Sequence, residues 1–179
     1  MSTPAIVQSI YDSGIALWMR GSLKAMPIVE AAHVLAIAIV FGTILVVDLR
    51  LLGLAGTSRP YSVVAREMLG KTWTAFVCSV ITGALMFAPN AITYFGNTAF
   101  RLKMLALLLA GLNMVVFQVL TARSMPAWDT SARTPNAART AAIISIGLWT
   151  AIIFLGRWIG FTKGYDFSVP QDVQFEFPQ

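Results

Sequence analysis

Four ionisable side chains lie inside long apolar stretches of the sequence, where a charge is costly and usually serves a function. They are Glu30, His33, Lys103 and Arg157. Glu30 and His33 are three residues apart, so on a helix they share one face. If the apolar stretches are helices that cross a membrane in alternating directions, all four side chains fall in the same half of it. We therefore predict one polar cluster in that half, which either binds a ligand or is satisfied within the chain.

The metal chemistry open to this cluster is narrow. A Glu-x-x-His spacing occurs in di-iron helical bundles, but such a site needs a second pair, and His33 is the only histidine. Cys78 is the only cysteine, which excludes a thiolate metal cluster. Haem b held by His33 is an alternative, and His33 is then the metal ligand. We favour a chain without a cofactor, in which Glu30 pairs with Lys103 or Arg157 and His33 hydrogen-bonds beside them.

A second polar group is predicted near the opposite membrane face. It consists of Asp48, Arg50 and Gln118. Asp48 and Arg50 are two residues apart, so they point to different sides of a helix. We interpret them as a structural anchor at a helix end. Asn113 lies in the middle of an apolar stretch, where a hydrogen bond to a neighbouring helix is favoured over a ligand site.

The composition indicates which elements must position these residues. Of 179 residues, 57% are hydrophobic and 12% charged, and the mean hydropathy is +0.72. Soluble domains carry about 25% charged residues. Four apolar stretches, at 25–47, 72–88, 104–122 and 141–161, are each near the roughly 20 residues that cross a bilayer as a helix. The sequence therefore predicts an all-α integral membrane four-helix bundle.

The chain divides into three parts on this pattern. Residues 1–24 are predicted to be an amphipathic segment that lies in the interface as a helix, residues 25–164 the transmembrane domain, and residues 165–179 a polar and aromatic tail. The net charge of +5 comes from basic residues beside the apolar stretches, which fits the lipid bilayer as partner and does not indicate nucleic acid. Seven basic residues on one side against six on the other favour both termini outside.

Several segments together resemble an uncharacterised family of four-helix bacterial inner-membrane proteins, a domain of unknown function. They are EAAHVL, VVDLRLLGLAG, ITGALMF, NTAFRLKMLALLLAGLNMVVFQ and ISIGLWTAIIFLGRWIGF, and the resemblance spans roughly residues 18 to 162. The chain is also remotely similar to membrane proteins of the copper-resistance D type. These resemblances imply a multi-pass protein of the bacterial cytoplasmic (inner) membrane.

The family resemblance also bears on metal binding. In the family pattern a second histidine follows an Asn-x-x-x-Phe stretch, and here Gln118 stands at that position. At about 1.5 Å per residue, His33 and Gln118 differ in depth by roughly 16 Å in their helices. One haem iron could not bind both positions, so a two-histidine site is not expected.

The sequence contains no phosphate-binding loop, nucleophile elbow or dinucleotide fingerprint. We therefore expect a membrane subunit or small-ligand-binding protein without catalysis of its own, built around the buried polar cluster. One alternative is an electron-transfer protein with haem b on His33. Another is an ion or proton carrier, which would need a homo-oligomer or a partner in a membrane complex because four spans without an inverted repeat do not make a transporter.

Overall fold

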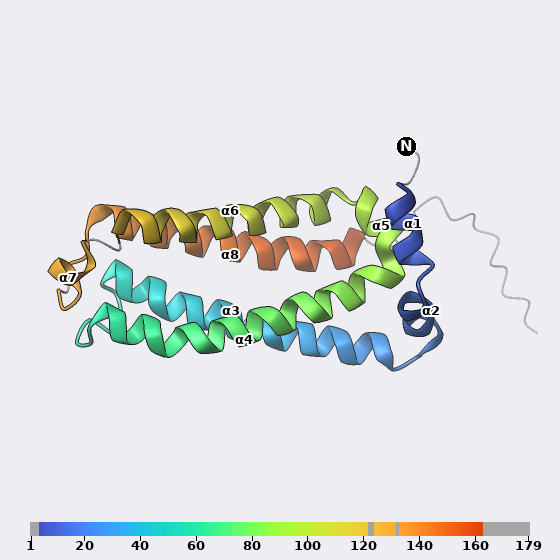
Figure 1. The fold of residues 1–179 in the computed structure, drawn as a ribbon, viewed down its shortest axis with the longest axis horizontal. Helices are drawn as coiled ribbons and strands as arrows, with labels where there is room; N and C mark the ends of the chain where they lie inside the picture. Colours follow the sequence, from blue (N-terminus) through green and yellow to red (C-terminus); the bar gives the residue numbers. More distant parts are fainter. Residues whose placement is uncertain (1–3, 122–123, 132, 163–179) are drawn as a thin grey trace, which may run out of the picture.

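Four long helices run side by side along the molecule in the computed structural model, which describes residues 4–121, 124–131 and 133–162 (Figure 1). They are α3 (Ala25–Leu52), α4 (Tyr61–Phe87), α6 (Thr98–Thr121) and α8 (Asn136–Thr162). Within the described residues all regular elements are helical, as predicted. The helices α3, α6, α8 and the continuous stretch Tyr61–Gly96 are each long and apolar enough to cross a membrane.

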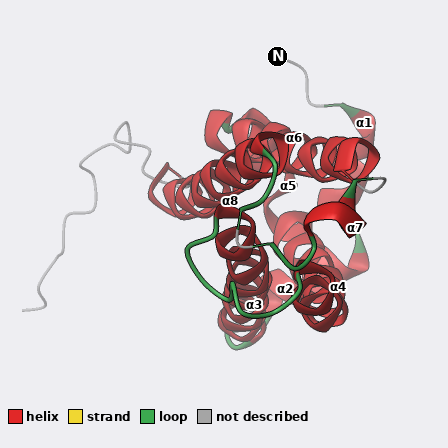
Figure 2. Ribbon diagram, turned by 90° about the vertical axis from the view of Figure 1, so that its left-hand side faces the viewer, coloured by secondary structure: helices red, strands yellow, loops and turns green. Residues whose placement is uncertain are grey.

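The long helices form two antiparallel pairs. α3 packs against α4, and α6 packs against α8, while α3 also contacts α8 and so joins the pairs (Figures 1 and 2). Three of the helices begin before the predicted spans: α4 by eleven residues, α6 by six and α8 by five. The reason is that polar residues such as Arg66 and Glu67 remain helical although they are exposed, so hydropathy underestimates the length of a helix that extends beyond its apolar part.

The N-terminal segment consists of two short helices, α1 (Ala5–Tyr11) and α2 (Gly14–Gly21), where one interfacial helix was predicted. Ser13 separates them, because its side chain accepts a hydrogen bond from the backbone N–H of Ala16 at 3.3 Å and caps α2. Both helices pack on the turn formed by η1 (Ala88–Asn90) and α5 (Ala91–Gly96). They therefore cover one end of the long helices (Figure 1).

The opposite end is closed by two loops and the short helix α7 (Met125–Trp128). α3 stops at Gly53, whose left-handed φ of +75° suits glycine and ends the helix. An apolar cluster packs the loops onto the helices, and its buried members are Leu51, Tyr61, Trp128, Ala138 and Ala142. The predicted tail at 165–179 lies outside the described residues.

Candidate functional site

His33 lies between α3 and α4 and is held by one hydrogen bond. Its Nδ1 is 2.9 Å from the hydroxyl oxygen of Thr82, and the carbonyl oxygen of Ser79 also faces the ring. The single hydroxyl proton of Thr82 is directed to the carbonyl oxygen of Cys78, 2.7 Å away. Thr82 therefore accepts from the imidazole, so Nδ1 carries the ring proton in the neutral form. Nε2 is left with a lone pair that can accept a hydrogen bond or bind a metal.

Two glycines make room for the side chains of the cluster. A Cβ atom at Gly83 on α4 would lie 3.2 Å from Cε1 of His33, and one at Gly156 on α8 would lie 3.2 Å from Nζ of Lys103. Each bare backbone thus forms a notch that a longer side chain of the facing helix occupies. The charge of Lys103, which is half-buried, is close enough to act on the imidazole of His33. His33 and Lys103 are therefore brought together from α3 and α6, as the depth argument predicted.

The other two members of the predicted cluster are exposed, although the charge of Glu30 also acts on the imidazole of His33. Glu30 is exposed, and no Lys or Arg nitrogen of the described residues lies within 4.0 Å of its carboxylate. Arg157 is also exposed, with its guanidinium 5.4 Å from the ring centre of Phe161. The predicted ion pair of Glu30 with Lys103 or Arg157 is wrong. A separation of three residues turns a helical side chain by about 60°, which is enough to direct Glu30 outward while His33 faces α4.

At the other end of the long helices, Arg50 is fully buried, at 0% exposure, and ties two loops together. Its Nε donates to the carbonyl oxygen of Arg59 at 2.9 Å. Its Nη2 donates to the carbonyl oxygens of Asp129 at 3.2 Å and Ser131 at 3.3 Å. The prediction of a structural anchor at the helix end agrees with these contacts. Arg50 holds the α3–α4 loop and the loop after α7 against the end of α3.

Asp129 caps the start of α4 within the same group of loops. Its carboxylate accepts from the backbone N–H of Ser62 and from the Ser62 hydroxyl, each at 2.7 Å. These two bonds, hydroxyl first, lower the pKa of Asp129, and the nearby charge of Arg50 adds to the effect. The negative charge of the carboxylate is also stabilised by the positive end of the dipole of α4, at the start of the helix. Asp129 is therefore a charged helix cap in a loop that Arg50 fixes in place.

The remaining polar residues predicted near this end differ in their surroundings. Asp48 is buried at 6% exposure, and it turns to α8, where it interacts with the side chain of Ser145. Gln118 is exposed on α6, outside the buried surroundings of Asp48. Asn113 donates from Nδ2 to the carbonyl oxygen of Ala141 at 3.0 Å, which is the hydrogen bond between helices that was predicted. Asp48 is left as a buried acidic group away from the His33 cluster.

The sequence matches the model of one known protein family. A family of unknown function, DUF6644, has a sequence model that matches residues 19–162, from α2 to the end of α8. The chain belongs to this family. The match confirms the resemblance to an uncharacterised family and covers His33, Lys103, Asp48, Arg50 and Asp129. A search of curated proteins and a search of solved structures each found no match.

Sequence reasoning missed two residues that shape the site, namely Thr82 and Gly83. Each carries little signal alone, since threonine and glycine are common in membrane helices for packing. Their importance comes from what they face across a helix pair. The only hint in the sequence was that Thr82 and Gly83 lie at the same predicted depth as His33.

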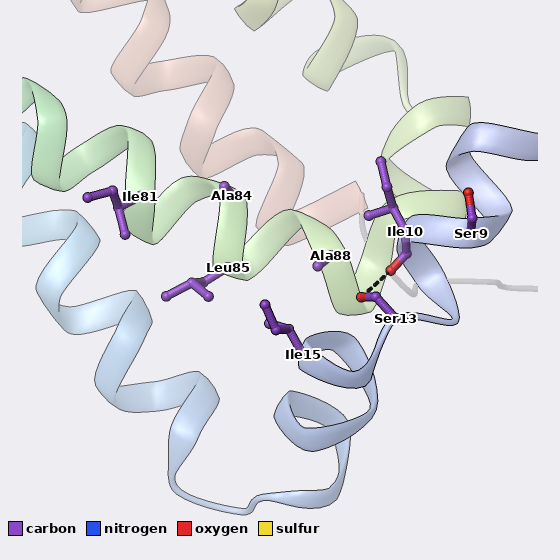
Figure 3. Close-up of a pocket in the computed structure, with 8 residues that line it drawn as sticks. All are labelled: Ser9, Ile10, Ser13, Ile15, Ile81, Ala84, Leu85 and Ala88. Carbon is purple, nitrogen blue, oxygen red and sulfur yellow. Dashed lines mark hydrogen bonds between the residues drawn. The ribbon is translucent and has the colours of Figure 1, made fainter.

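An apolar cleft lies beside α4 at the end covered by the N-terminal helices (Figure 3). Its volume is about 540 Å³, and it is lined by Ser9, Ile10, Ser13, Ile15, Ile81, Ala84, Leu85 and Ala88. The hydroxyls of Ser9 and Ser13 are already bonded to carbonyl oxygens of α1, the latter to Ile10 at 2.7 Å. The cleft therefore offers mainly apolar contact and is separate from the His33 cluster.

Proposed function

We propose that this chain is a multi-pass protein of the bacterial cytoplasmic membrane that binds a small ligand between its helices at His33 and Lys103. In this proposal it serves as a ligand-binding protein or membrane subunit without catalysis of its own. The observation that carries the proposal is Lys103, a half-buried cation in an apolar helix. Among the described residues no carboxylate oxygen lies within 4.0 Å of its ammonium group. A cation in a bilayer that lacks an internal partner indicates a partner from outside the chain.

The chemistry of the two side chains indicates what kind of head group fits. The ammonium group of Lys103 donates hydrogen bonds and attracts negative charge. Nε2 of His33 accepts a hydrogen bond in the neutral form, because the protonated Nδ1 donates to the hydroxyl oxygen of Thr82. A molecule with an acidic or carbonyl oxygen for Lys103 and a hydroxyl group for His33 would satisfy both. Its remaining part must be apolar, since the neighbouring exposed positions of α6 are leucine and methionine.

Haem b on His33 is the second candidate, and one observation favours it. The acceptors on the Nδ1 side leave Nε2 for iron and would orient the ring, as such hydrogen bonds do at metal sites. Against it, the backbone of α4 at Gly83 packs against the edge of the imidazole. Met104, a conceivable second axial ligand, is exposed on α6. These contacts support an organic ligand over haem, and we expect no cofactor.

The test compares what the wild-type protein retains with what a Lys103→Met variant retains. Both are purified in lipid nanodiscs, and their extracted small molecules are compared by liquid chromatography and mass spectrometry. A Lys71→Ala variant is the control, because Lys71 is exposed on α4. We expect one compound to be enriched in the wild type and the control and to be lost from Lys103→Met. Equal retention by all three proteins would refute the site.

The same preparations decide between the two candidates. An absorption spectrum should lack the Soret band of haem, even when the cells are supplied with haem. A stoichiometric Soret band that is lost in a folded His33→Ala variant would instead make electron transfer the leading function. The mass of the intact complex would report whether copies of the chain or a partner share the site. Reporter fusions in the loops near residues 60, 97 and 132 would test the proposed orientation, in which both termini are outside.

A further inference from the structure

Asp48 is a buried acidic group that the proposed ligand site does not use. It lies on α3, fifteen residues after His33, which places it about 22 Å further along the helix at about 1.5 Å per residue. Its side chain is 6% exposed, and its Oδ2 atom is buried with no hydrogen-bond partner. The carboxyl group therefore has an unused polar atom inside a helix that is long and apolar enough to cross a membrane.

The neighbours of Asp48 offer it no positive charge. On α8 the side chain that interacts with it is Ser145, a neutral hydroxyl. On α4 the charges of both Asp48 and Asp129 act on the phenol of Tyr61, so that side also offers no cation. No Lys, Arg or His nitrogen of the described residues lies within 4.0 Å of the Asp48 carboxyl. The charged residues of α8, Arg139 and Arg157, are exposed.

Arg50 is the nearest cation in the sequence, but its geometry directs it elsewhere. Two residues along a helix correspond to about 200° of rotation, so Asp48 and Arg50 point to different sides of α3. Arg50 donates to carbonyl oxygens of the two loops, and Cδ of its side chain is 3.8 Å from where a Cβ would lie at Gly56. Its Nη1 atom is buried with no hydrogen-bond partner, but no nitrogen of Arg50 lies within 4.0 Å of the Asp48 carboxyl, so the two residues form no ion pair.

We propose that Asp48 is a buried proton-binding site near one end of the predicted membrane span, which holds its proton at neutral pH. The physical reason is that an ionised carboxylate without a counterion is far more costly in apolar surroundings than the neutral acid. The neutral acid needs only hydrogen bonds, and the hydroxyl of Ser145 can supply one. A carboxyl that binds and releases a proton is also what the proton-carrier alternative requires, although this proposal does not depend on the ligand site.

The experiment measures the carbonyl stretching band of protonated carboxyl groups by infrared spectroscopy. The protein is reconstituted in phospholipid vesicles and titrated from acid to alkaline pH, in water and in D₂O. Asp48→Asn is the test variant, because it keeps the size of the side chain and removes the titrating group. Glu30→Gln is the matched control, since Glu30 is the other acidic residue of α3 and is exposed.

We expect a protonated-carboxyl band at neutral pH in the wild type and in Glu30→Gln, and its loss in Asp48→Asn. Exchange into D₂O should shift the band, which would show that the proton reaches the solvent. Two results would overturn the proposal: no such band in Glu30→Gln at neutral pH, or a band that persists unchanged in Asp48→Asn. Helix content measured by circular dichroism on each sample establishes that the variants are folded, so that band loss is not due to unfolding.

Discussion

Replacing Arg50 by alanine should destabilise the protein more than any other single change to a charged residue. The side chain is completely buried and donates to three backbone carbonyl oxygens in two loops. A hydrogen bond from a charged donor contributes about 1.5–3 kcal/mol, although water at the end of the molecule would replace part of this. Three such bonds, partly replaced by water, lead us to expect a loss of about 3–5 kcal/mol.

The loss should appear as a lower melting temperature in detergent. For a chain of this size about 2–4 °C corresponds to 1 kcal/mol, so Arg50→Ala should melt about 6–20 °C lower. Trp128, one of five tryptophans, is buried beside Tyr61, so tryptophan fluorescence includes a signal from the loops, and circular dichroism follows the helices. The melting temperature of Arg50→Lys should lie between those of the wild type and Arg50→Ala. One ammonium group cannot reproduce the separate donors that the guanidinium directs at the two loops.

Arg66→Ala is the control for this prediction, because Arg66 is an exposed arginine near the same end of α4. Surface substitutions of this kind usually change stability by no more than about 0.5 kcal/mol. The melting-temperature shift of Arg50→Ala is converted to a free energy in the same way. If that free energy is less than about 1 kcal/mol, the hydrogen bonds of Arg50 do not hold the loops, and the reasoning is refuted.

Three further predictions concern single contacts. Hydrogen bonds from Ser62 lower the pKa of Asp129. The stability that Asp129 contributes is therefore complete above the ordinary aspartate pKa of about 3.9 and is lost as the pH falls through the lowered pKa. The melting temperature should drop on acidification, and it should drop less in Asp129→Ala. Asn113→Ala should cost only about 0.6 kcal/mol in SDS unfolding, the average for hydrogen bonds between membrane helices; a loss above about 2 kcal/mol would contradict a single bond to Ala141. Gly83→Ala places a methyl group 3.2 Å from the histidine ring, so the nitrogen resonances of the ring should shift in the NMR spectrum, and an unchanged spectrum would show that the notch is not tight.

The sequence alone determined the number of long helices and the approximate position of each. Apolar length is a local property, so a stretch of about 20 apolar residues can be recognised without knowledge of its neighbours. The position of a residue along its helix follows from the same count, and the expectation that His33 and Lys103 lie at one level rests on it. The helix-end role of Arg50 and the helix-to-helix bond of Asn113 were also predictable, because polar groups in apolar surroundings must find partners.

Only the tertiary structure decided which way each helix faces. α3 is apolar around its whole circumference, so its sequence contains no amphipathic pattern that could distinguish the direction of Glu30 from that of His33. The division of the N-terminal segment at Ser13 depended on one local cap. The partners of Arg50 lie 9, 79 and 81 residues away in the sequence, and chain folding alone brings them to one point. Asp48 is buried without a counterion for the same reason, because the packing of α3 against α4 and α8 fixed its surroundings.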